Sequence, residues 1–137
     1  MRLLLVTVCL AAVACATATA ASNGRIAARC SASGDSCYAI FKDRGDVIRF
    51  QLTLAARYYN RYRICVKPPK PPPGGPPAGG ATACASFPVK RTVSLYGGAV
   101  IWERNFPRSL AQGRYRVTWT PGVQSVGPGV SLFFVAP

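Results

Sequence analysis

Apolar and polar residues alternate along several short segments of this chain, which is the pattern of β-strands that bury one face. In residues 47–54 the even-numbered positions are apolar, and Arg49, Gln51 and Thr53 point the other way. Comparable alternation predicts strands over residues 61–67 and 114–120, and the more apolar run of residues 130–135 predicts a final strand. Shorter candidate strands lie over residues 37–41, 85–89, 92–96 and 100–103. No long amphipathic helical pattern accompanies them, so we expect an all-β chain.

Turn-forming residues separate these segments, at 43–46, 97–98, 112–113, 121–122 and 127–129. About seven short strands with regular turns predict an antiparallel β-sandwich. Residues 68–80, PPKPPPGGPPAGG, cannot form a strand because proline lacks the amide donor. We expect them to form a long loop within one domain, since the flanks are too small for two cores.

The first residues have the pattern of a secretory signal peptide. Arg2 precedes an apolar run over residues 3–16, and the Ala-Thr-Ala sequence of residues 18–20 forms a small-x-small cleavage site. The apolar run is too short for a spanning helix, which needs about 20 residues. A lipoprotein site at Cys15 is the weaker alternative, because Ala12 stands where a larger aliphatic residue is usual.

This pattern divides the chain into three parts. We expect a signal helix over residues 1–20, an N-terminal segment over 21–36 and the sandwich over 37–137. The mature chain would have no transmembrane segment, and it would be secreted, periplasmic or part of the cell envelope.

Four cysteines would remain after cleavage: Cys30, Cys37, Cys65 and Cys84. An even number in a small exported domain predicts two disulfides. Three pairings are possible, and we favour Cys30–Cys37 and Cys65–Cys84 because each closes a local loop. Strand parity places Cys65 and Cys84 on the outer face of their sheet, where they could join across a hairpin.

The segment Leu110-Ala-Gln-Gly113-Arg-Tyr115-Arg-Val117 resembles the Leu-x-x-Gly-x-Tyr-x-Val pattern at strand F of immunoglobulin-like and fibronectin type III-like domains. The resemblance covers about residues 102–135 and implies an exported, bacterial-type domain with an immunoglobulin-like β-sandwich fold. It implies that Tyr115 is the tyrosine-corner residue, whose hydroxyl bonds back to the backbone. Val117 stands where immunoglobulin domains have a cysteine, so their inter-sheet disulfide is not expected.

Few residues could carry catalysis. The chain has no histidine, which excludes a histidine base and a Ser-His triad. Its four carboxylates are scattered; Asp43 and Asp46 flank a turn, but Lys42 and Arg44 neutralise them. The cysteine spacing matches no zinc pattern, and oxidised cysteines are not nucleophiles. We therefore expect no enzyme, no cofactor and no metal site.

The charge balance favours an anionic partner. Seventeen lysines and arginines against four acidic residues give a net charge of +13. If the sandwich is immunoglobulin-like, strands C (58–67) and F (114–120) are neighbours. Arg61 and Arg63 would then lie beside Arg114 and Arg116 on the outer face, and like charges placed opposite each other destabilise a sheet.

We therefore expect a non-enzymatic, exported binding or cell-envelope accessory domain that contacts anionic polymers by charge. The residues expected to do so are Arg57, Arg61, Arg63, Lys67, Arg114 and Arg116. The alternative is a structural or protein-interaction module of unknown partner, in which the arginines keep the surface soluble. A membrane-active factor would need an amphipathic segment, and the sequence shows none.

Four aromatic residues leave a choice between surface and core. Tyr58 and Tyr59, which lie between arginines, either stack on a polyanion or begin a strand with one ring turned inward. Trp102 and Trp119 are expected in the core.

Overall fold

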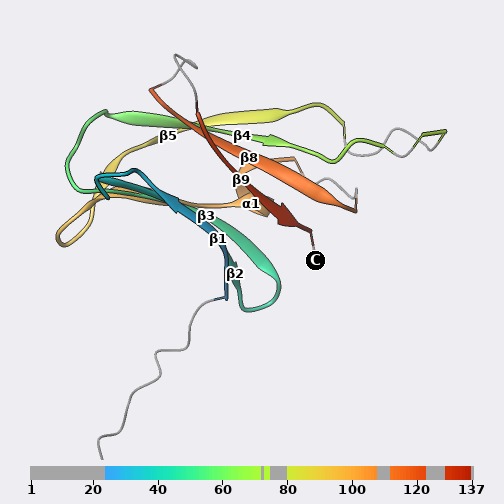
Figure 1. Ribbon diagram of the computed structural model, residues 1–137, viewed down its shortest axis with the longest axis horizontal. Helices are drawn as coiled ribbons and strands as arrows, with labels where there is room; N and C mark the ends of the chain where they lie inside the picture. Colours follow the sequence, from blue (N-terminus) through green and yellow to red (C-terminus); the bar gives the residue numbers. More distant parts are fainter. Residues whose placement is uncertain (1–23, 72, 75–79, 108–111, 123–128, 137) are drawn as a thin grey trace, which may run out of the picture.

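A computed structural model of the chain describes residues 24–71, 73–74, 80–107, 112–122 and 129–136. The expected signal peptide, Leu110 and part of the 68–80 segment lie outside the described residues. The described chain is all-β, as the alternation predicts, and it consists of two antiparallel sheets with one short helix (Figure 1).

The first sheet contains five strands in the order β1-β2-β3-β7-β6. These strands are β1 (Gly24–Cys30), β2 (Ser36–Asp43), β3 (Val47–Leu54), β6 (Lys90–Arg91) and β7 (Tyr96–Ile101). Helix α1 (Trp102–Asn105) follows β7 directly.

The second sheet contains four strands in the order β5-β4-β8-β9. These are β4 (Arg61–Lys67), β5 (Ala83–Pro88), β8 (Arg114–Pro121) and β9 (Val130–Val135). Strands β3, β4 and β9 begin and end where the sequence predicts, and β8 is one residue longer.

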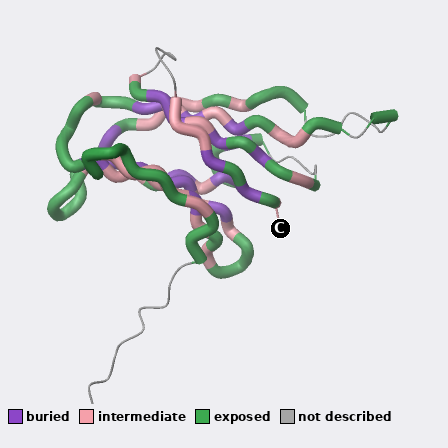
Figure 2. Tube along the Cα trace, viewed as in Figure 1, coloured by how far each residue is buried: buried purple, intermediate pink, exposed green. Residues whose placement is uncertain are grey.

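The core lies between the two sheets, where the alternating apolar residues of both meet (Figure 2). The Phe50 ring of β3 lies 6.1 Å from the Trp119 ring of β8 and 5.8 Å from the Phe134 ring of β9. Trp102 and Trp119 are both buried, as expected. Each large apolar side chain buried in this way stabilises the fold by about 1.5–3 kcal/mol.

The disulfides are Cys30–Cys37 and Cys65–Cys84, as predicted. Each joins two residues that directly oppose each other on neighbouring strands, β1 with β2 and β4 with β5. The second disulfide spans 19 residues of sequence and contributes about 3 kcal/mol in the chain-entropy treatment. This contribution offsets the conformational entropy that is lost when the proline- and glycine-rich segment is closed into a loop.

The prediction of a turn at residues 97–98 is wrong, because both glycines lie inside β7. A Cβ atom on Gly97 would overlap the Leu52 carbonyl oxygen, and one on Gly98 would overlap the Tyr62 hydroxyl. Close neighbours, and not a reversal of the chain, require glycine here.

The prediction of a strand over residues 92–96 is wrong too, since the turn lies there. The backbone N–H of Thr92 donates to the Leu95 carbonyl oxygen over 2.7 Å. At the far end of β7 the strand stops at Ile101, and Trp102 begins helix α1, so the prediction of a strand over 100–103 is correct only in its first half.

Strand β1 has no counterpart among the predicted strands. It forms an edge of the first sheet, and all its residues except Ala27 are exposed. The pairing with β2 shifts between Arg25 and Ala27, which marks a bulge. An exposed, bulged strand has no regular alternation, so the sequence carried no signal for it.

Candidate functional site

The outer face of the second sheet carries only basic charge. The alternation that buries Tyr62, Ile64 and Tyr115 turns five cations outward: Arg61, Arg63, Lys67, Arg114 and Arg116. None of the four strands of this sheet contains an acidic residue. All four carboxylates of the chain lie in β2, in the turns of the first sheet or in α1.

The register between β4 and β8 decides how these cations are grouped. Lys67 directly opposes Arg116, and Arg63 opposes Thr120. Because the strands are antiparallel, Arg61 and Arg114 lie toward opposite ends of the pair, eight residues or about 26 Å apart. The arginines share one outer face as predicted, but Arg61 and Arg63 do not lie beside Arg114 and Arg116.

Lys67, Arg114 and Arg116, which we call the basic cluster, are all exposed. The Arg116 Nε donates to the Ser131 Oγ over 3.2 Å, and the Arg114 guanidinium lies 4.0 Å from the centre of the Phe133 ring. No carboxylate pairs with the basic cluster, because the two ion pairs of the described residues lie in the first sheet. Among the described residues, the three cations of the cluster therefore have no acidic counter-ion.

Buried aromatic side chains pack on the inner face of the strands that carry the basic cluster. The Tyr115 ring, which lies between Arg114 and Arg116 in the sequence, is buried and stacks on Phe134 at 5.1 Å. It also meets the edge of Trp102 at 5.0 Å. The role of the Tyr115 hydroxyl in a tyrosine corner stays a prediction.

Arg61 and Arg63 form a second, smaller group at the other end of β4. The Arg61 Nη2 donates to the Ser86 carbonyl oxygen over 3.1 Å. Uncharged groups lie between this pair and the basic cluster: the Cys65–Cys84 disulfide and the hydroxyls of Thr118 and Ser131, which hydrogen-bond at 2.9 Å.

Arg57 lies apart from both groups. It belongs to the loop between β3 and β4, and its guanidinium lies 5.5 Å from the centre of the Tyr96 ring in the first sheet. Of the tyrosines that follow it, Tyr58 is 55% exposed, whereas Tyr59 packs against the core. Burial and the nearby Tyr38 raise the pKa of Tyr59. One ring therefore turns inward, as one of the two interpretations predicts.

The turn between β2 and β3 keeps its carboxylates paired. Asp43 accepts from Arg49 at 2.7 Å, and this hydrogen bond lowers the pKa of Asp43. Asp46 pairs with Lys42 at 2.8 Å. Within the described ranges, no group of three or more histidine, cysteine, aspartate or glutamate residues could hold a metal ion.

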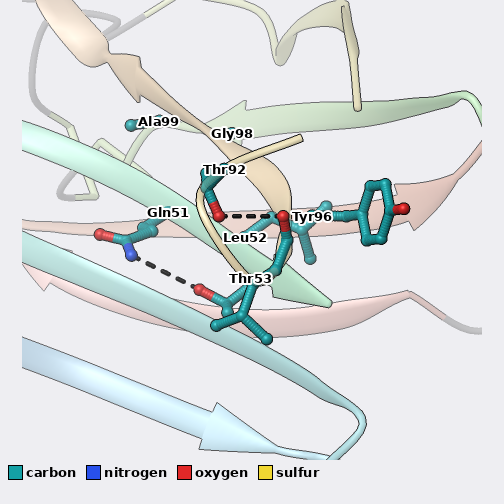
Figure 3. Close-up of a pocket in the computed structure, with 8 residues that line it drawn as sticks. Gln51, Leu52, Thr53, Thr92, Tyr96, Gly98 and Ala99 are labelled. Carbon is teal, nitrogen blue, oxygen red and sulfur yellow. Dashed lines mark hydrogen bonds between the residues drawn. The ribbon is translucent and has the colours of Figure 1, made fainter. Parts of the chain in front are cut away.

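A hollow of about 250 Å³ opens beside the turn between β6 and β7 (Figure 3). It is lined by Gln51, Leu52, Thr53, Thr92, Leu95, Tyr96, Gly98 and Ala99. The lining of the hollow contains no histidine, cysteine, acidic or basic side chain. The sequence carries no signal for this hollow, because Gly98 has the composition of a turn residue and only the structure places it inside β7.

No protein-family model, curated protein or solved structure matches this chain. In the part of the chain that the structure describes, no helix has both the length and the apolar character needed to cross a membrane.

Proposed function

We propose that this chain is a non-enzymatic, exported domain that binds anionic polymers through the outer face of its second sheet. The observation that carries the proposal is the basic cluster, in which Lys67 directly opposes Arg116 and Arg114 follows on the same face. No carboxylate of the chain lies in that sheet.

Like charges that directly oppose each other across a strand pair destabilise the sheet. A polyanion supplies the counter-charge and releases its own condensed ions, so binding both relieves the repulsion and gains entropy. The cluster is held by a two-sheet core, and little backbone freedom is lost when a polymer docks. Phosphate-type contacts of this kind carry affinity but little sequence information.

Export and an immunoglobulin-like topology belong to the same proposal. Two disulfides suit an oxidising compartment, and residues 1–20 have the signal-peptide pattern. Strands β4 and β8 are neighbours in one sheet, as strands C and F are in immunoglobulin-like domains. The mature protein should begin near Ala21 and contain no free thiol; four titratable thiols in the native protein would contradict export.

A structural or protein-interaction module is the second candidate. It is favoured by the contacts that the arginines make within the sheet, Arg116 with Ser131, Arg114 with Phe133 and Arg61 with Ser86. In this case the cations would keep the surface of the domain soluble and would not bind a polymer.

Salt-titrated binding to duplex DNA and to heparin separates the two candidates. A variant with the basic cluster changed to glutamine should bind both polymers more weakly, and its salt slope on DNA should fall by about 3, because each lost phosphate contact lowers the slope by about 0.9. The control variant changes Arg25, Arg29 and Arg44, exposed in and next to the first sheet, to glutamine and has the same net charge. Equal slopes in the two variants would favour the structural module.

A further inference from the structure

A second surface lies at the end of the molecule opposite residues 68–71, at the turn between β6 and β7 (Figure 1). At this turn Val93 is fully exposed, and Leu95 is 39% exposed. The Thr92 backbone N–H and Oγ1 both donate to the Leu95 carbonyl oxygen, over 2.7 and 2.9 Å. Two hydrogen bonds therefore close the turn that carries these two apolar side chains.

Neither turn chemistry nor packing explains Val93. Tight turns favour glycine, proline, asparagine, aspartate and serine, and a β-branched valine is not among them. The side chain contributes nothing to the core, because it is fully exposed. Leu95 instead helps to line the hollow beside the turn, together with Thr92 (Figure 3 labels Thr92). The exposed Val93 side chain is therefore free to enter an apolar environment outside the chain.

Cations surround the turn. Lys90 and Arg91 directly precede it, are exposed and pair with the first residues of β7. The Arg57 guanidinium lies 5.5 Å from the centre of the Tyr96 ring, and the exposed Tyr58 follows Arg57.

One carboxylate lies at the same end of the molecule, that of Asp35, whose backbone carbonyl accepts from Ala55. The local balance around the turn is therefore basic.

We propose that this end of the domain docks onto an anionic lipid bilayer. Val93 and Leu95 enter the boundary between headgroups and acyl chains, while Lys90, Arg91 and Arg57 meet the anionic headgroups. Apolar side chains gain from burial in that boundary, and each cation near an anionic leaflet adds attraction. Tyrosine is common at this depth, which suits the exposed Tyr58.

A soluble polyanion fits this surface less well, because it has no apolar region in which the exposed valine could be buried. The docking surface also differs from the basic cluster, which lies on the second sheet. The sequence showed no amphipathic helix because the apolar and basic residues are brought together by a turn and by a loop more than 30 residues earlier.

The test uses the purified full-length mature protein and vesicles of phosphatidylcholine with and without phosphatidylglycerol. The parent should sediment with the anionic vesicles. Val93→Ser should weaken this binding about tenfold, since it removes a buried apolar side chain. Lys90→Gln and Arg91→Gln should each weaken it about fivefold. The matched control is Val135→Ser, which removes a 66% exposed valine at the far end of the molecule and should leave binding unchanged.

Insertion into the bilayer is measured by the tryptophan fluorescence of a Val93→Trp variant, which brominated lipids quench on contact. Trp102 and Trp119 are buried, so quenching by the lipid should report the new tryptophan alone. Quenching supports the inference; no quenching, or a Val93→Ser variant that binds like the parent, overturns it. Loss of vesicle binding only when the basic cluster is changed to glutamine would also overturn it, while leaving the proposed polymer binding intact.

Discussion

Reversing the charge of Lys67 should stabilise this protein and weaken its binding to polyanions. In the parent, Lys67 directly opposes Arg116, and both are exposed. Two charges about 7 Å apart in water repel each other by about 0.6 kcal/mol. Opposed cross-strand pairs contribute about 0.2–1 kcal/mol of either sign. Lys67→Glu turns the repulsion into attraction, so we expect a gain of about 1 kcal/mol in the free energy of unfolding.

Urea and thermal unfolding measure this gain, which corresponds to a rise in Tm of about 4 °C for a domain of this size. The control is Lys90→Glu, which changes the net charge equally but directly opposes Gly97. Adding Arg116→Glu to Lys67→Glu restores a like-charge pair and should cancel the gain. At about 1 M salt the Debye length falls to about 3 Å, and the differences should largely disappear.

Two results would refute the reasoning. If Lys67→Glu were no more stable than Lys90→Glu, the repulsion derived from the register would be absent. If Lys67→Glu were more stable and still bound DNA and heparin as the parent does, the basic cluster would not be the binding site. The expected combination is a higher free energy of unfolding with weaker polyanion binding. It would show that the basic cluster lowers the stability of the protein.

Other perturbations test the packing and the titrating groups. Gly97→Ala should lower the free energy of unfolding in urea by about 3 kcal/mol or more, because its Cβ would overlap the Leu52 carbonyl. The control Gly34→Ala, at a position with a φ of 77° and open space, should lower it by about 1 kcal/mol. Equal losses would contradict the close packing of β7. Tyr115→Phe should cost about 1 kcal/mol, and a neutral result would argue against the tyrosine corner. Burial raises the pKa of Tyr62 from 10.0 to about 12, so the stability that it contributes is complete below pH 10 and is lost as the pH rises toward 12. Unfolding followed over this range should show a smaller loss for Tyr62→Phe than for the parent, and an equal loss would refute this assignment.

Local pattern was enough for much of the fold. The alternation in residues 47–54 and 61–67 predicts β3 and β4 at their observed bounds, because a strand with one buried face imposes a period of two on its own residues. The apolar run of residues 130–135 predicts β9 at its observed bounds. The same parity turns Cys65 and Cys84 outward, and the short separations of the cysteines favour the observed pairing. These features depend on neighbours within a few residues or across one hairpin.

Contacts between distant segments decided the rest. Gly97 and Gly98 have the composition of a turn, and only Leu52 and Tyr62, more than 30 residues away in sequence, make them part of a strand. The sequence places Lys67 and Arg116 on one face, but the antiparallel register of β4 and β8 is what sets them opposite each other. Parity is a local property of each strand, whereas register belongs to a pair of strands. The grouping of charge on this surface could therefore be known only from the tertiary structure.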